Sequence, residues 1–326
     1  MRKTALLGTF LFLCLLTGCT KEIKTTDDSL TYTASAQPKA VYQMETVRSA
    51  DVLSLSSESL CVLPLDRQND EHASITAKAG LLMDVTGEQV IFADSAYEKL
   101  YPASITKLMT ALLVLQNCDL NETVTVSYNA SHIGVYGAKL CGLAEGDRLS
   151  METLLTSLLI YSGNDAGSAI AEHIAGTEEA FADMMNQEAL RLGAVDTHFC
   201  NSHGLHDINH YTTAYDIYLI MNELIQYPKF LSIVSMDSYT AQYHDKNGTA
   251  VEKVFESTNQ FFTGAAVVPD GVTVLGGKTG TTNAAGSCLS LYVKSNTGNY
   301  YVAEIFKADS STSLYNQMRA LLDMIP

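Results

Sequence analysis

A block of helical sequence in the middle of the chain, with strand-like segments before and after it, limits the folds available. Between residues 104 and 226, apolar residues recur at the three- and four-residue intervals of helices that bury one face. Short apolar runs divided by turn residues occur at 79–92 and again between 239 and 306, as is typical of strands. A final helical segment covers 311–324. This order predicts an α+β fold, with an antiparallel β-sheet flanked by helices and an all-helical subdomain.

The expected elements can be given as residue ranges. Helical segments with a broad apolar stripe are Ser104–Gln116, Met151–Tyr161, Asp165–Ala175, Glu178–Leu192, Thr213–Gln226 and Ser311–Met324. Strand segments are Ala79–Asp84, Gln89–Phe92, Tyr239–Tyr243, Val251–Phe255, Val272–Leu275, Ser287–Val293 and Tyr300–Phe306.

The first residues indicate export. A short basic start is followed by an apolar stretch, 4–16, that is too short to span a bilayer core of about 30 Å. Such a pattern is typical of a signal peptide, which we expect at 1–18. The stretch Leu16–Cys19 resembles the bacterial lipobox, and this resemblance implies cleavage before Cys19 and lipid attachment to its sulfur. The alternative is an ordinary secretory signal in which Cys19 has no role.

Residues 19–73 are rich in Ser, Thr, Asp and Gln without a sustained period, so we expect a flexible tether there and a folded domain at 74–326. The formal net charge of −16 and the lack of a basic run argue against nucleic acid as a partner. The cysteines after Cys19 form no CxxC pair and suggest small buried side chains, with a Cys118–Cys141 bridge left open.

The first candidate for chemistry is Ser104-Ile105-Thr106-Lys107. On a helix, residues three apart are neighbours with Cβ atoms about 5–6 Å apart, so the Lys107 amine can reach the Ser104 hydroxyl. A serine becomes a good nucleophile when a base takes its proton. A lysine can serve as that base only if burial or a nearby cation lowers its pKa. The alternative is a capping serine beside a solvated lysine.

Two later motifs accompany it. Ser162-Gly163-Asn164 lies between two expected helices, where a tight turn can direct a hydroxyl and an amide into a cleft. Lys278-Thr279-Gly280-Thr281 follows two glycines on an expected strand, and Gly280 would let a substrate backbone approach closely. Taken alone, Ser162-Gly163-Asn164 could be an ordinary helix-capping loop, and Lys278-Thr279-Gly280-Thr281 could be part of a glycine-rich hairpin.

Together these segments resemble the S-x-x-K, S-x-N and K-T-G set of serine penicillin-binding proteins and serine β-lactamases. Over about 74–326 the chain resembles, more closely, the low-molecular-mass D-alanyl-D-alanine carboxypeptidases. The segments that carry this resemblance are Pro102–Thr110, Ser162–Ala166, Leu192-Gly193, Thr197–Asn201, Gly204-Leu205 and Gly277–Gly280.

The resemblance implies a penicillin-binding-protein fold and a reaction on peptidoglycan stem pentapeptides without a metal or cofactor. Ser104 would attack the carbonyl of the penultimate D-alanine, and β-lactams would acylate the same serine. The catalytic residues implied are Ser104, Lys107, Ser162, Asn164 and Lys278. The substrate-binding residues implied are Thr279, Gly280 and Thr281, and the backbone N–H groups of Ser104 and Thr281 would form the oxyanion hole. Such an enzyme would work at the extracytoplasmic face of the membrane.

The chain departs from this family in one respect, and rival functions stay open. Some relatives place an arginine near the carboxylate pocket, whereas this chain has none between Arg191 and Arg319. A serine β-lactamase, a D,D-endopeptidase or a transpeptidase would use the same acyl-enzyme, although Ser-Gly-Asn and the lack of an E-x-x-L-N stretch favour the carboxypeptidase. A zinc peptidase that uses His203, His206 and His210 is a rival from a different class of enzyme, and an inactive wall-binding lipoprotein is a rival without activity.

Overall fold

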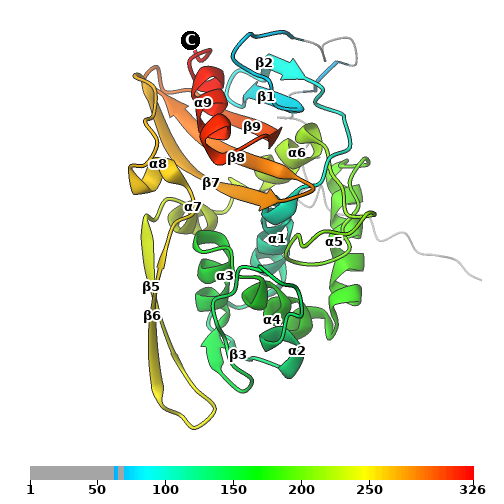
Figure 1. The fold of residues 1–326 in the computed structure, drawn as a ribbon, viewed down its shortest axis with the longest axis vertical. Helices are drawn as coiled ribbons and strands as arrows, with labels where there is room; N and C mark the ends of the chain where they lie inside the picture. Colours follow the sequence, from blue (N-terminus) through cyan, green and yellow to red (C-terminus); the bar gives the residue numbers. More distant parts are fainter. Residues whose placement is uncertain (1–61, 65–69) are drawn as a thin grey trace, which may run out of the picture. The chain divides into compact units, whose positions relative to one another are not determined.

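The computed structural model of the chain describes residues 62–64 and 70–326 (Figure 1). The expected signal peptide, the lipid site Cys19 and most of the expected tether lie outside the described residues. Leu63, from the tether range, is buried in the hydrophobic core, and its carbonyl accepts a hydrogen bond from the Tyr97 hydroxyl at 2.7 Å. The backbone N–H of Asp70 donates to Ala93 O. Packing on the folded part therefore begins before residue 74.

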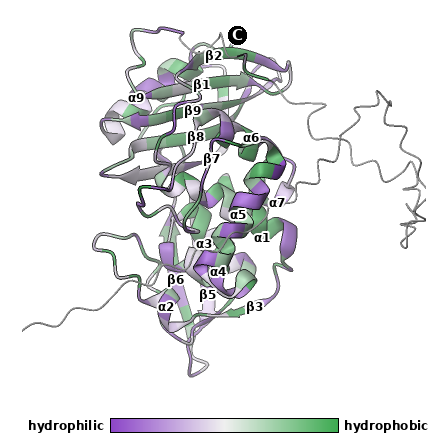
Figure 2. Ribbon diagram, turned by 90° about the vertical axis from the view of Figure 1, so that its right-hand side faces the viewer, coloured by the Kyte–Doolittle hydropathy of each residue, from purple (hydrophilic) through white to green (hydrophobic). Residues whose placement is uncertain are grey.

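A five-stranded antiparallel sheet brings the two ends of the folded part together. Its strand order is β2-β1-β9-β8-β7, and Figure 2 shows the strands stacked in this order. The strands are β1 (Ala79–Asp84), β2 (Gln89–Asp94), β7 (Val272–Thr282), β8 (Gly286–Ser295) and β9 (Tyr300–Ala308). Early and late segments share one sheet because β1 pairs with β9 along its whole length. The predicted antiparallel sheet is confirmed.

Both faces of this sheet are covered. The last helix, α9 (Ser311–Leu322), packs on one face, and α6 (Ala214–Leu224) packs on the other. Alternate residues of β1 accordingly belong to two separate apolar clusters: Leu81 and Met83 to one, and Leu82 to the other. A strand covered on both sides must be apolar along most of its length, and all six residues of β1 are buried.

The helical block forms the second layer, with α1 buried at its centre. Its helices are α1 (Lys107–Asn117), α2 (Tyr128–Ser131), α3 (Met151–Ile160), α4 (Asn164–Ala175), α5 (Glu178–Leu192), α6 and α7 (Pro228–Val234). A short helix, α8 (Gln260–Thr263), precedes β7. A second sheet, in the order β3-β4-β5-β6, is formed by β3 (Thr123–Thr125), β4 (Arg148–Ser150), β5 (Ser238–His244) and β6 (Ala250–Glu256). The all-helical subdomain of the prediction thus carries this extra small sheet.

The start of the first helix differs from the prediction. The helix expected from Ser104 begins with a 3-10 turn, Ala103–Thr106, and α1 starts only at Lys107. Ala103 has a φ of +48°, a conformation that no regular helix contains. The Cys118–Cys141 bridge that the sequence left open is absent, since the four cysteines in the part of the chain that the structure describes are all unpaired.

The strand expected at 272–275 is only the first part of a longer element. It continues without a break through the Lys278–Thr281 motif as the eleven-residue strand β7. Among the helices of residues 70–326, none is long and apolar enough to cross a membrane.

Candidate active site

The structure brings the three motifs to one place. Ser104 lies in the 3-10 turn and Lys107 begins α1, while the Ser162–Asn164 turn joins α3 to α4. The edge strand β7 runs past the 3-10 turn and carries Lys278–Thr281. Segments separated by more than 170 residues thus surround one serine.

The candidate base of this site is held by three contacts. The Lys107 amine lies 2.9 Å from Ser104 Oγ, 2.7 Å from Asn164 Oδ1 and 2.5 Å from the carbonyl oxygen of His203. Its side chain is fully buried, and this burial lowers the pKa of Lys107 from 10.5 to about 7. Nearby acidic groups, Asp165 and Glu178 among them, oppose the shift without cancelling it.

This contact set accommodates both protonation states of the amine: an ammonium can donate to all three oxygens, and a neutral amine can donate to two of them and accept from the Ser104 hydroxyl. A neutral lysine has two N–H donors and one lone pair, whereas the ammonium form has three donors. Asn164 Oδ1 and His203 O accept the two N–H groups. In the neutral form, which the pKa of about 7 allows, the lone pair is left for the Ser104 hydroxyl, which is the arrangement that proton transfer from serine to lysine requires.

A second serine–lysine pair lies beside the first. Lys278 Nζ donates to Ser162 Oγ at 3.0 Å and to Thr279 O at 2.9 Å. Lys278 is 1 % exposed, and burial, together with the charge of Lys107, holds its pKa well below 10.5. Ser162 is held at a φ of +72°, which costs a non-glycine residue about 1–3 kcal/mol and is typical of functional sites. The 3.0 Å contact is short enough for a proton to pass between the two side chains.

Two glycines hold the nucleophile turn from opposite sides. A Cβ on Gly204 would lie 1.8 Å from Ala103 O, and one on Gly280 would lie 2.7 Å from Pro102 O. From the sequence, we expect Gly280 to be needed for the close approach of a substrate backbone. The structure shows that a side chain here would already collide with the protein's own turn, so packing alone demands the glycine.

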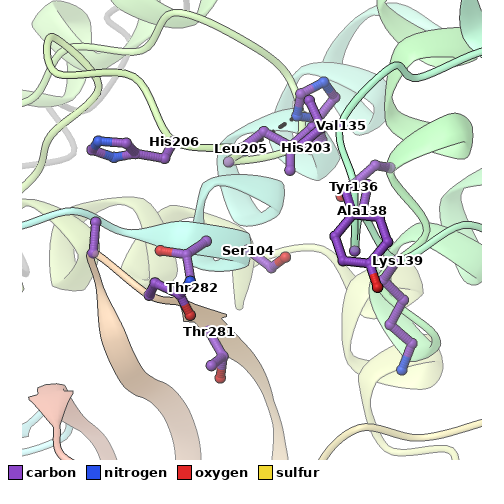
Figure 3. Close-up of a pocket in the computed structure, with 15 residues that line it drawn as sticks. Ser104, Val135, Tyr136, Ala138, Lys139, His203, Leu205, His206, Thr281 and Thr282 are labelled. Atoms are coloured by element: carbon purple, nitrogen blue, oxygen red, sulfur yellow. Dashed lines mark hydrogen bonds between the residues drawn. The ribbon is translucent and has the colours of Figure 1, made fainter.

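Two cavities open beside Ser104. The larger, about 600 Å³, extends toward Asn164, the His203–His206 segment and Thr281 (Figure 3). The smaller, about 360 Å³, lies on the side of Ser162 and Thr279–Thr281. Of the residues proposed from the sequence, Lys107 and Lys278 line neither cavity, because they lie behind the serines that they contact.

Sequence reasoning missed several residues of this site. His203 acts through its backbone carbonyl, which no side-chain pattern reveals. Lys139 lies in an irregular loop, and its carbonyl accepts a hydrogen bond from the N–H of Asn164 at 2.8 Å. The Asp165 carboxylate accepts hydrogen bonds from three consecutive N–H groups, 141–143, of the same loop.

The three histidines considered for zinc have separate surroundings. His210 Nε2 lies 2.7 Å from Thr106 Oγ1, and the His206 ring meets the Tyr101 ring edge-on at 4.6 Å. Burial lowers the pKa of both His203 and His210 to about 3, so both stay neutral at physiological pH. Within 62–64 and 70–326, no three His, Cys, Asp or Glu side chains are grouped to hold a metal. The zinc peptidase therefore gains no support from the described residues.

Known structures share this fold. The crystal structure of the Streptomyces K15 DD-transpeptidase matches with a TM-score of 0.72 at 24% identity, over 78% of this chain and 98% of that one. The D-alanyl-D-alanine carboxypeptidase from Mycobacterium tuberculosis H37Rv matches with a TM-score of 0.66 at 26% identity, over 76% of this chain and 90% of that one. Fold and site thus define an α+β protein with the fold of the penicillin-binding proteins, in which two buried lysines lie behind the serines that they contact.

The particular family follows from sequence similarity. Residues 66–306 match the peptidase S11 family, described as D-alanyl-D-alanine carboxypeptidase, and the chain belongs to this family. It is 33% identical over 258 residues to D-alanyl-D-alanine carboxypeptidase DacF of Bacillus subtilis, a match that covers 76% of this chain and 61% of that protein. It is 32% identical over 261 residues to D-alanyl-D-alanine carboxypeptidase DacD of Escherichia coli, a match that covers 76% of this chain and 62% of that protein. The chain spans about three fifths of the length of these curated relatives.

Proposed function

We propose that this chain is a serine-type D-alanyl-D-alanine carboxypeptidase that removes the terminal D-alanine from peptidoglycan stem pentapeptides, and that β-lactams inhibit it. The observation that supports this most directly is the buried Lys107 amine, which lies 2.9 Å from Ser104 Oγ and whose pKa burial lowers to about 7. The family membership supplies the substrate class. The catalytic domain of this proposal is 74–326.

In the proposed reaction, Ser104 Oγ attacks the carbonyl carbon of the penultimate D-alanine and gives its proton to Lys107. The oxyanion that forms is stabilised by the backbone N–H groups of Ser104 and Thr281. The C–N bond then breaks, and the leaving amine takes the proton that Lys107 received, passed on through Ser162 and Lys278. Water attacks the acyl-enzyme carbonyl and gives a proton to the neutral Lys107, which returns it to Ser104 Oγ as the ester bond breaks. Asn164 keeps Lys107 in position throughout.

Substrate binding is assigned to strand β7. Thr279, Gly280 and Thr281 line the smaller cavity next to Ser104, where the terminal D-alanine would lie. Thr281 lines both cavities and so stands where the scissile bond would cross from one to the other.

The test is a D-alanine release assay on the full chain in mild detergent, with a stem pentapeptide as substrate and Ser104→Ala as the blank. We expect stoichiometric release of one D-alanine per pentapeptide, and a penicilloyl adduct that mass spectrometry maps to Ser104. Fast turnover of nitrocefin would instead indicate a β-lactamase. Transfer of the acyl group to added glycine in preference to water would indicate a transpeptidase. Wild-type protein that releases no D-alanine would refute the carboxypeptidase.

We further propose that the enzyme is held at the outer face of the membrane by a lipid on Cys19, after removal of 1–18, with the sequence between Cys19 and the folded part as a tether. The lipobox-like Leu16–Cys19 supports this. Replacing Cys19 by alanine is expected to move the protein from the membrane fraction to the soluble fraction, because each buried CH₂ of a lipid contributes about 0.8 kcal/mol. Cys61→Ala serves as the matched control. A Cys19→Ala protein that still sediments with membranes would exclude this anchor.

A further inference from the structure

The smaller cavity beside Ser104 has the chemistry of an anion site. Seven of its ten lining residues carry a hydroxyl group, none is acidic, and Lys139 is its only charged residue. The whole chain has a formal net charge of −16, whereas this cavity is lined by one lysine and no acidic residue.

Several of these hydroxyl groups have their hydrogen atoms left to donate. Tyr315 Oη accepts from the N–H of Gln260 at 2.8 Å, and Ser311 Oγ accepts from Gln260 Nε2 at 3.0 Å. Thr258 Oγ1 accepts from Thr279 Oγ1 at 2.6 Å. A hydroxyl oxygen that already accepts a hydrogen bond keeps its own O–H free for another partner. The cavity therefore offers donors, which an anionic ligand needs.

Lys139 supplies a cation with no anion beside it. Its ammonium lies 4.2 Å from the centroid of the Tyr161 ring, which holds a cation without neutralising it. Among the residues that the structure describes, no carboxylate pairs with this ammonium, and no hydrogen-bond acceptor does either. In Figure 3, Ser104 lies between Lys139 on one side and Thr281 on the other.

The remaining cations near this cavity are less available. Lys278 is 1 % exposed, and its amine already contacts Ser162 Oγ and Thr279 O. Arg319 lines a different cavity, which shares Tyr315 with this one. The residues of α9 that line the smaller cavity are Ser311, Leu314 and Tyr315, and none of these three is charged.

We infer that Lys139 supplies the positive charge that binds the C-terminal carboxylate of the acyl donor in this cavity. This inference rests on the proposed function, because it places the terminal D-alanine next to Ser104. The carboxylate receives hydrogen bonds from the free hydroxyl groups and a charge-assisted bond from Lys139.

The test compares two donors that differ only at the carboxylate: diacetyl-lysyl-D-alanyl-D-alanine and the same peptide with a C-terminal amide. The variants are Lys139→Met, which removes the charge, and Lys139→Arg, which keeps it. Lys294→Met is the matched control, because Lys294 also lies over a tyrosine ring, Tyr300 at 5.1 Å, but lines neither cavity beside Ser104.

For Lys139→Met we expect kcat/KM for the free acid to fall by about 10- to 100-fold, the usual effect of one hydrogen bond to a charged group, while the amide changes little. Lys139→Arg and Lys294→Met should keep the selectivity of the wild type. An equal loss for both peptides would show a structural role and overturn the inference, as would an unchanged rate for the acid.

A second pair of ligands separates this inference from the proposed function. Acylation of Ser104 by benzylpenicillin and by its methyl ester is measured in the same variants of the full chain. A selective loss for the free acid supports Lys139 as the carboxylate ligand even if the wild type releases no D-alanine, an outcome that would refute only the carboxypeptidase. Equal acylation of the acid by wild type and Lys139→Met would overturn the inference.

Discussion

Replacing Lys107 by methionine is expected to lower the rate constant for acylation of Ser104 by about 10³- to 10⁴-fold, the upper range for loss of a general base. The reason is the geometry of the amine: in its neutral form it can donate to Asn164 Oδ1 and His203 O, which leaves its lone pair for the Ser104 hydroxyl. Methionine fills the same space without a lone pair of comparable basicity. Labelling of the full chain with a fluorescent penicillin measures the effect.

The pH dependence of acylation gives an independent check. Burial lowers the pKa of Lys107 to about 7, so the neutral and basic form of the amine accumulates as the pH rises through 7. Acylation by the wild type should therefore rise about tenfold per pH unit below 7 and level off above it. Lys107→Arg should not restore activity, because a guanidinium cannot lose its proton in this range. An arginine variant that acylates at nearly the wild-type rate would show that Lys107 acts only through its charge.

Replacing Gly204 by alanine is expected to have the second large effect. The new Cβ would lie 1.8 Å from the carbonyl oxygen of Ala103 and 2.8 Å from Thr106 Oγ1, so the turn that carries Ser104 must move. Overpacking of this kind costs about 3 kcal/mol or more in the free energy of unfolding. A displacement of the nucleophile by about 1 Å can cost about 100-fold in rate. Urea unfolding and penicillin labelling measure the two effects separately.

Gly176→Ala is a matched control for this variant. Gly176 has the same φ as Gly204, +82°, but a Cβ there would meet nothing within 4 Å. It therefore reports the cost of placing alanine in the left-handed region, about 1 kcal/mol, without a collision. If Gly204→Ala and Gly176→Ala lose the same stability and acylate equally fast, then Gly204 does not support the nucleophile turn.

The sequence was a good guide to the family and a partial guide to the fold. The α+β class followed from the order of periodic segments, because apolar spacing records which face of a helix or strand is buried. The start of the first helix was misplaced, since the positive φ of Ala103 leaves no trace in the apolar pattern. The small sheet β3-β4-β5-β6 was missed in part, because strands of three residues are too short to show a period.

The sequence by itself determined which residues are candidates for the chemistry, since the spacing of Ser104 and Lys107 on one helical turn brings a hydroxyl and an amine together. Only the tertiary structure decided that the amine is equipped to act as a base. Its pKa depends on burial, and its orientation depends on a carbonyl, His203 O, whose position comes from a distant loop. The same holds for Lys139, whose proposed role depends on its lack of an anionic partner. Desolvation and pairing belong to the packed chain, and no short motif encodes them.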